Sequence, residues 1–137
     1  MLFVKYTVES DIGKKRIINE DRAAFFERSD KLKLAILADG MGGHNAGDVA
    51  SEMAVVQFEK YFKEADASIF ECEDTIKQWL EQSVSTLNYE MYQHSLTHDS
   101  CHGMGTTLIV AVITNNKEIV VSHVGDSRVY TFTNDET

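Results

Sequence analysis

The sequence has no proline and only two cysteines, and each shortage narrows what the chain can be. Without proline there is no proline-rich linker between domains, so residues 1–137 are expected to form a single domain. Cys72 and Cys101 lack the paired spacing of a metal site, and we expect both to be reduced thiols. These shortages argue against a disulfide-stabilised secreted scaffold.

Long hydrophobic runs and an excess of positive charge are also missing. No apolar run approaches the roughly 20 residues that a membrane span needs. Residues 1–6 resemble a strand more than an export signal, so we expect a cytoplasmic chain with no membrane partner. Thirteen basic residues against 22 acidic ones give a net charge of −9. Nucleic acid is therefore not an expected partner, because phosphate contacts require a basic face.

Hydrophobic periodicity predicts three strands, two helices and three more strands, which is an α+β order rather than alternating βαβ units. The two helices are expected to pack side by side, and turn signals at residues 28–30 and 115–116 predict two hairpins. The expected strands are 3–8, 23–27, 33–38, 106–114, 118–124 and 127–133, and the expected helices run over 46–65 and from about 68 into the mid-nineties.

The stretch from Leu34 to His44 is the strongest candidate for a functional site. Five apolar residues end at Asp39, which predicts a buried strand with one carboxylate at its end. The glycines that follow, beginning with Gly40, allow a sharp turn and a close backbone approach. Asp-Gly alone is also a common turn dipeptide. Beside a glycine-rich backbone, however, the carboxylate suits Mg²⁺ or Mn²⁺, which prefer oxygen ligands.

Three acidic points, Glu20 with Asp21, Asp39, and Asp126, each lie at a break in a predicted strand, so these acids can converge. On residue chemistry alone Glu20 and Asp21 could equally be solvated surface charge, and Asp126 could be a turn acid. Arg16 could likewise belong to a plain basic loop with its neighbouring lysines, although a guanidinium matches phosphate oxygens well.

Four motifs together resemble those of the metal-dependent type 2C (PPM-type) protein serine/threonine phosphatases, and the Asp-Gly-Met-Gly-Gly-His wording is closest to the bacterial branch. The motifs lie at residues 16–21, 38–51, 103–107 and 123–128, in the family's order. The resemblance covers nearly the whole chain but only about the first half of a family catalytic domain. It implies a partial α-β-β-α sandwich, with two antiparallel sheets and a helical pair, incomplete in this chain.

The resemblance also implies roles for individual residues. Asp39 corresponds to the aspartate that bridges two Mn²⁺ or Mg²⁺ ions, and Gly40 to the glycine whose carbonyl oxygen binds one of them. Glu20 and Asp21 correspond to acids that support the metal-bound waters, and Arg16 to the arginine that clamps the substrate phosphate. Asp126 corresponds to a ligand of a third ion.

The implied activity is hydrolysis of phosphoserine and phosphothreonine in proteins by a metal-activated water. The implied substrates are signalling phosphoproteins modified by a serine/threonine kinase. Two later family aspartates have no counterpart after Arg128, so we expect the 137-residue chain to be weakly active or inactive alone, with self-association through its incomplete sheets. Met41 stands where some relatives place a histidine proposed to protonate the leaving group.

Three other interpretations are open at this stage. The chain could be a non-catalytic, phosphatase-like interaction or regulatory module. A haloacid-dehalogenase type of phosphatase would need a second aspartate where Met41 stands. His94, His98 and His102 fall at four-residue steps, which on one continuous helix would suit zinc, but residues 96–103 read as a helix end and a loop. His123 alternates with apolar neighbours and is expected to be packed.

Overall fold

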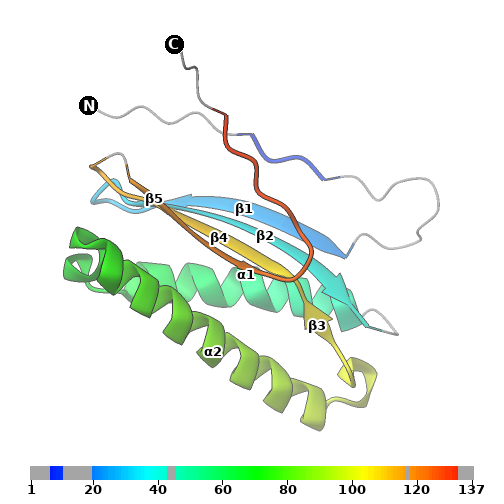
Figure 1. Ribbon diagram of the computed structural model, residues 1–137. Helices are drawn as coiled ribbons and strands as arrows, with labels where there is room; N and C mark the ends of the chain where they lie inside the picture. Colours follow the sequence, from blue (N-terminus) through cyan, green and yellow to red (C-terminus); the bar gives the residue numbers. More distant parts are fainter. Residues whose placement is uncertain (1–6, 11–19, 43–45, 117, 133–137) are drawn as a thin grey trace.

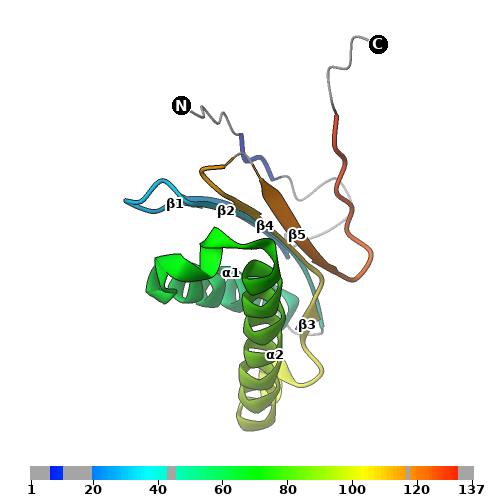
Figure 2. The same ribbon diagram turned by 60° about the vertical axis from the view of Figure 1, so that its left-hand side comes forward.

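The computed structural model describes residues 7–10, 20–42, 46–116 and 118–132. Within them an antiparallel sheet lies against a layer of two helices, and residues 7–10 and 128–132 lie on the far side of the sheet from the helices (Figures 1 and 2). The strands are β1 (Asp21–Glu27), β2 (Lys33–Met41), β3 (Gly105–Thr106), β4 (Leu108–Ile113) and β5 (Ile119–Val124); the helices are α1 (Ala46–Glu64) and α2 (Glu73–Thr97), with short 3-10 helices at Ala67–Glu71 and Asp99–Cys101. The α+β fold class is confirmed.

The sheet has the order β1-β2-β4-β5, and β3 pairs with the end of β2. All of these pairings are antiparallel. In register, Ala24 lies opposite Ile36, Ile36 opposite Val110, and Val110 opposite Ser122. Directly opposite residues share a face of the sheet, so this row identifies the face that packs on the helices.

Both predicted hairpins form. The turn between β1 and β2 is closed by a hydrogen bond from the Arg28 amide to the Leu32 carbonyl oxygen, at 2.8 Å, with Lys31 in the left-handed region at φ 73°. The turn between β4 and β5 is closed by a hydrogen bond from the Thr114 amide to the Glu118 carbonyl oxygen, at 2.9 Å. The residues of each turn therefore suffice to pair β1 with β2 and β4 with β5, without contacts between distant parts of the sequence.

Helix α1 faces the sheet with residues at four-residue steps. Ala50, Ala54, Phe58 and Phe62 are fully buried, so small side chains line its first half and aromatic rings its second. The small residues allow the start of the helix to approach the sheet closely. The rings pack edge-on with α2, and the centroids of Phe58 and Trp79 are 6.2 Å apart. The prediction that the helices pack side by side is confirmed.

Arg28 joins the first hairpin to the far end of α1. Its Nη1 donates to the carbonyl oxygens of Phe62 and Ala65, at 2.7 and 2.8 Å, and its guanidinium lies over the Phe62 and Phe70 rings. Cations near the C-terminus of a helix bond to the carbonyls that have no helical partner. This contact fixes the end of α1 that lies away from the glycine-rich turn.

Three sequence-based expectations need correction or limits. The strand predicted at 127–133 is wrong for the described part of it, because residues 127–132 adopt no strand and Val129, Tyr130 and Phe132 are exposed. In the strand predicted at 3–8, Thr7 and Val8 are not in a strand, and 3–6 lie outside the described residues. The described residues form one sheet of the two that the resemblance implies.

None of the helices in the described ranges is both long enough and apolar enough to cross a membrane.

Candidate functional site

Two aspartates lie on paired strands near the end of strand β2. Asp39 on β2 lies directly opposite Asp21 on β1, so both side chains project from the same face of the sheet. The neighbouring Ala38 is fully buried toward the helices, which places the acids on the other face. Two carboxylates on one face are oxygen donors of the kind that hard divalent cations prefer, so the donor set fits such an ion.

Two glycines bring the end of β2 against the start of α1. A Cβ atom added at Gly40 would overlap the carbonyl oxygen of Gly47, so only glycine permits this approach. The Gly40 amide donates to the Glu20 carbonyl oxygen at 3.1 Å. The backbone beside Asp39 is therefore bare and held in place from two sides.

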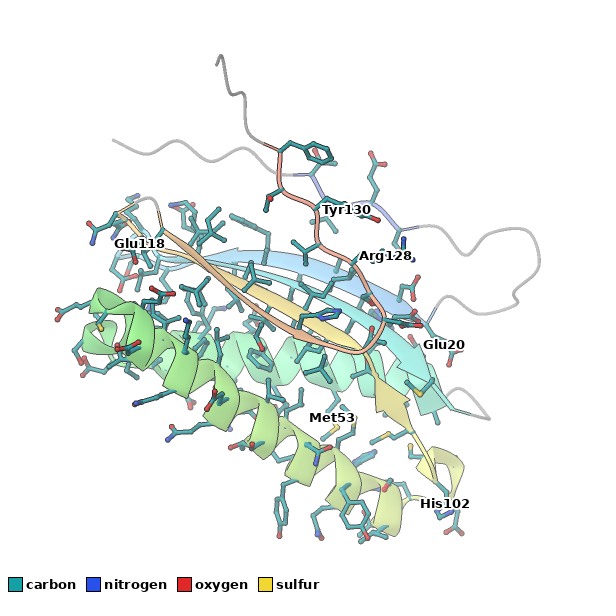
Figure 3. The ribbon with its side chains drawn as sticks, in the orientation of Figure 1. Glu20, Met53, His102, Glu118, Arg128 and Tyr130 are labelled. Carbon is teal, nitrogen blue, oxygen red and sulfur yellow. The ribbon has the colours of Figure 1, made fainter. Side chains whose placement is uncertain are left out.

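The Glu20 carboxylate lies at the start of α1 rather than beside Asp21. A Cβ at Gly47 would overlap this carboxylate, which shows how closely it packs on the helix N-terminus. The positive end of the helix dipole favours a carboxylate at this place. Figure 3 shows Glu20 at the end of the sheet where β1 begins. Glu20 and Asp21 are thus neighbours in sequence with different surroundings.

An ion pair fixes the same end of α1 to β1. Arg22 Nη2 donates to Asp48 Oδ1 at 2.6 Å, and Asp48 belongs to the first turn of α1. The two side chains are about one-third to two-fifths exposed, so the pair contributes at most about 1 kcal/mol. Its main effect is positional, because it keeps the helix N-terminus beside the strand that carries Asp21.

Thr107 links Asp39 to the loop that carries Asp126. The Asp39 amide donates to Thr107 Oγ1 at 3.1 Å, and the Thr107 amide donates to the Asp39 carbonyl oxygen at 2.9 Å. Thr107 Oγ1 lies 2.7 Å from Ser127 Oγ. Gly125, at φ 102°, packs so tightly that an added Cβ would lie 2.7 Å from Thr107 Cγ2. The loop is therefore anchored on the end of β2.

Sequence reasoning placed Thr107 in a strand without seeing this link. It named Gly47 within a motif without a role, and it missed the ion pair of Arg22 and Asp48. The signal for Gly47 was its place one turn after the glycine-rich stretch, at the start of an amphipathic helix. Nothing in the sequence pairs Arg22 with Asp48, because the contact depends on where the helix lies.

The structure brings some of the expected site residues together and leaves others apart. Asp21 and Asp39 face each other, Gly40 and Glu20 adjoin them, and Asp126 is exposed on the anchored loop. Arg16 and His44 lie outside the described residues. Within the described residues, no group of three or more histidine, cysteine, aspartate and glutamate side chains is placed to hold a metal ion.

The described histidines are not arranged as a zinc site would require. His94 and His98 stack with ring centroids 3.9 Å apart and planes 12° from parallel. Helix α2 ends at Thr97, so His102 follows on a separate segment, as the loop prediction required. The expectation that His123 is packed is wrong, because it is exposed and its Nε2 lies 2.5 Å from the Ser127 carbonyl oxygen.

Comparisons with known proteins bear on this site. A family model described as protein phosphatase 2C matches residues 13–137. A curated relative, the serine/threonine phosphatase Stp of Listeria innocua, is 41% identical over 126 residues, which is 92% of this chain and 49% of the relative. The chain spans about half the length of the curated relatives it matches.

Two solved structures are similar in sequence and in fold. The serine/threonine phosphatase of S. agalactiae superposes with a TM-score of 0.76 at 41% identity, covering 86% of this chain and 47% of that one. The catalytic domain of the phosphatase PstP, solved in complex with two manganese ions, gives a TM-score of 0.69 at 31% identity, covering 88% and 47%. The described fold thus corresponds to about half of each neighbour.

Proposed function

The chain belongs to the protein phosphatase 2C family, and from this premise we propose that residues 1–137 are the N-terminal portion of a single catalytic domain that hydrolyses phosphoserine and phosphothreonine in proteins. The proposed substrates are cytoplasmic phosphoproteins modified by serine/threonine kinases. The observation that carries the proposal is the opposition of Asp21 and Asp39 at the end of β2.

The proposed metal residues are Asp39, Asp21, Glu20, Gly40 and Asp126. Asp39 and Asp21 offer oxygen donors from one face of the sheet, and Gly40 is proposed to add its backbone carbonyl at the same end. Glu20 and Asp126 lie on the two segments that adjoin this end. Such donors suit Mn²⁺ or Mg²⁺. When bound, a pair of these ions supplies an activated water and positive charge opposite the phosphoryl oxygens.

The remaining proposed roles belong to the chain's own side chains. Arg16 is proposed to bind the substrate phosphate, since a guanidinium offers paired donors to phosphate oxygens. Thr107 keeps Asp39 in place through two hydrogen bonds. Met41 cannot donate a proton, so it is not proposed to protonate the leaving alcohol.

The 137-residue chain is proposed to hold only part of the site. Support comes from its coverage of about half of each relative and from the absence, among the described residues, of a cluster of three metal-ligating side chains. The second face of the sheet, which no described helix covers, is proposed to receive the second sheet of a complete domain. We therefore expect weak or no phosphatase activity from the chain alone.

Manganese binding tests this proposal directly. Titration of the 137-residue chain, followed by the electron paramagnetic resonance signal of free Mn²⁺, should show binding that weakens at least about tenfold in Asp39→Asn, since one shared carboxylate is lost. Asp74→Asn is the matched control, because Asp74 is an exposed acid in the first turn of α2.

Two results would contradict the proposal. Equal Mn²⁺ affinity in the parent chain and in Asp39→Asn would show that Asp39 does not bind the metal ion. Vigorous hydrolysis of a phosphothreonine peptide by the 137-residue chain, abolished in Asp39→Asn, would show that this chain holds a complete site.

A second candidate function is a non-catalytic interaction module of the same fold. The observation that favours it is the open apolar surface at the sheet edge, where Ile119 and Val121 on β5 are 63% and 42% exposed. Self-association through this edge would conceal these side chains. Sedimentation at several protein concentrations measures it, and a chain that stays monomeric throughout excludes self-association through β5.

A further inference from the structure

His123 lies on the face of the sheet that no described helix covers. In register, Leu37 lies opposite Ile109, and Ile109 lies opposite His123, so these three side chains share one face. Leu37 precedes Asp39 by two residues in β2, and side chains two apart project from the same face of a strand. The His123 imidazole therefore lies on the same face as the Asp39 carboxylate, in the neighbouring row of the sheet.

The His123 imidazole closes the short loop that follows β5. Its Nε2 lies 2.5 Å from the Ser127 carbonyl oxygen. A carbonyl oxygen only accepts, so Nε2 must carry the proton of this hydrogen bond. Val124, Gly125 and Asp126 lie between the two bonded residues. One exposed side chain thus bridges the two ends of the loop that contains a proposed metal ligand.

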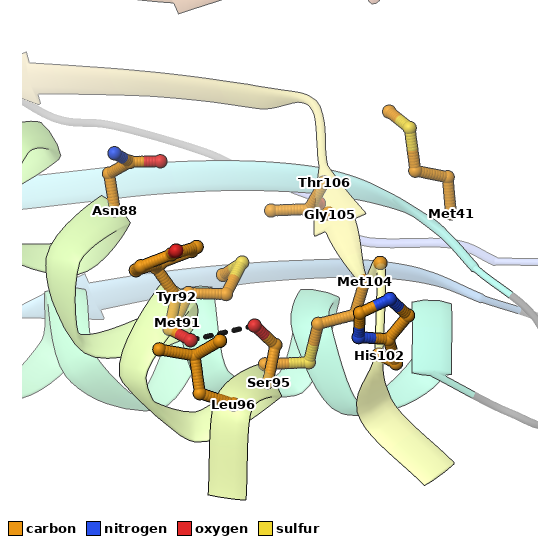
Figure 4. A pocket seen from close by; sticks show the side chains of 11 residues that line it. Met41, Asn88, Met91, Tyr92, Ser95, Leu96, His102, Met104, Gly105 and Thr106 are labelled. Atoms are coloured by element: carbon orange, nitrogen blue, oxygen red, sulfur yellow. Dashed lines mark hydrogen bonds between the residues drawn. The ribbon is translucent and has the colours of Figure 1, made fainter. Parts of the chain in front are cut away.

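Thr107 supports the same loop from the centre of the sheet. It is the single residue between β3 and β4. Before it, Thr106 pairs with Gly40, and Figure 4 shows Thr106 where β3 lies beside the end of β2. After it, Ile109 pairs with Leu37. The backbone is therefore held by strand pairing on both sides of Thr107, and its side chain gives the loop a rigid support.

Asp126 is held through both of its neighbours in sequence. Before it, an added Cβ at Gly125 would lie 2.7 Å from Thr107 Cγ2, so the backbone packs directly on that side chain. After it, Ser127 meets Thr107 through its hydroxyl, at 2.7 Å, and His123 through its carbonyl oxygen. Asp126 itself is exposed. An accessible carboxylate on a backbone fixed at both sides is pre-organised to bind an ion, because little chain entropy remains to be lost.

We infer that His123 is a positioning residue for Asp126: its hydrogen bond to the Ser127 carbonyl holds the loop in the conformation in which Asp126 binds a divalent cation. The inference rests on the proposed function, which makes Asp126 a metal ligand. His123 acts through the loop backbone and does not touch the ion. Because His123 is exposed, its replacement removes little buried surface and should leave the fold intact.

Backbone NMR relaxation of the 137-residue chain without metal tests how the loop is held. The amides of residues 124–127 should have order parameters near about 0.85, and His123→Ala should lower them toward about 0.6. His123→Gln should restore them, because the glutamine amide can donate to the same carbonyl. Val121→Ala is the matched control, since Val121 lies on the same face of β5, is 42% exposed and should leave the loop ordered.

Manganese affinity then tests the link from His123 to Asp126 through a double-mutant cycle. His123→Ala should weaken Mn²⁺ binding about threefold, as expected for one lost hydrogen bond, and His123→Gln should recover the parent affinity. In Asp126→Asn, which lacks the proposed ligand, His123→Ala should cause no further loss, because its effect passes only through that carboxylate. The electron paramagnetic resonance signal of free Mn²⁺ measures all four affinities.

The other outcomes overturn the inference in distinguishable ways. Unchanged order parameters at residues 124–127 in His123→Ala would show that Thr107 alone holds the loop. Losses of affinity that multiply in the double variant would show that His123 acts on another part of the site. Equal Mn²⁺ affinity in the parent chain, His123→Ala and Asp126→Asn, with weaker binding in Asp39→Asn, removes this inference and leaves the proposed function standing. Unchanged affinity in Asp39→Asn contradicts the proposed function itself, and this inference with it.

Discussion

The two faces of the sheet differ in how the chain covers them. On one face Leu34, Ile36, Val110 and Val112 are at most 3% exposed beneath the helices. On the other face Ala35, Leu37 and Ala111 are half-buried and line an open apolar groove of about 440 Å³, which residues 7–9 and Val129 also border. The closed face therefore supplies most of the hydrophobic stabilisation.

The candidate chemistry lies on the open face. Asp21 and Asp39 project from it, while the fully buried Ala38, which precedes Asp39 in β2, points to the helices. The main stabilising contacts and the proposed metal chemistry thus lie on opposite faces of one sheet, and changes on one face are expected to leave the other largely intact. Neighbouring residues of a single strand can test that separation.

Ile36→Ala and Leu37→Ala compare the two faces within β2. Ile36 is 3% exposed, so its truncation should lower the free energy of unfolding by about 4 kcal/mol, from lost transfer energy and a cavity. Leu37→Ala on the groove should cost only about 1 kcal/mol, because much of its surface is already in water. Urea denaturation at two protein concentrations measures both; equal losses would mean that the open face is covered in solution.

Gly40→Ala and Gly105→Ala test the junction where the end of β2 meets α1. A Cβ at Gly40 overlaps the Gly47 backbone, which cannot move aside as a flexible side chain can, so the variant should lose about 3 kcal/mol. Gly105→Ala makes an ordinary contact with Met41 at 3.5 Å and should change stability by less than about 1 kcal/mol. Thermal unfolding compares them, and matching midpoints would refute the close approach.

Tyr61→Phe gives the smallest expected effect and probes the helix layer. Burial raises the pKa of Tyr61 above its usual range, and the negative charge of Glu90 adds to the shift. A raised pKa means that the stabilisation is complete below about pH 10, where the unfolded tyrosine is neutral, and is lost as the pH rises further. Unfolding free energies between pH 8 and 11 should therefore fall more steeply in the parent chain than in Tyr61→Phe; parallel curves would show that Tyr61 is solvated.

Local signals made much of the fold predictable from the sequence. Turn residues at 28–30 and 115–116 correctly predicted both hairpins, and apolar residues at three- and four-residue steps correctly predicted both helices. The prediction of a strand over 127–133 is wrong for residues 127–132, because β-branched and aromatic residues favour a strand only where a partner strand offers hydrogen bonds. The prediction that the His123 side chain is packed was wrong because β5 lies at the edge of the described sheet, where even Ile119 and Val121 are exposed.

The site was predictable in its residue types but not in its arrangement. Acids at predicted strand breaks suggested convergence; in the structure Asp21 and Asp39 lie within β1 and β2, and the register places them opposite each other. The position of Glu20 at the start of α1 depends on a glycine contact between residues far apart in sequence, and the link through Thr107 spans 68 residues. Such contacts follow from packing, which no local pattern encodes.

The order of strands β1-β2-β4-β5 also has a consequence for the folding rate. Each outer pair is a hairpin of neighbouring residues and can close early, whereas the central pairing of β2 with β4 joins segments separated by both helices. Closing that long loop costs conformational entropy, and the stabilising contacts between β2 and β4 form only after the loop is closed. The central pairing is therefore expected to form late, so Asp21 and Asp39 come together in the first hairpin before Thr107 arrives to anchor the loop that carries Asp126.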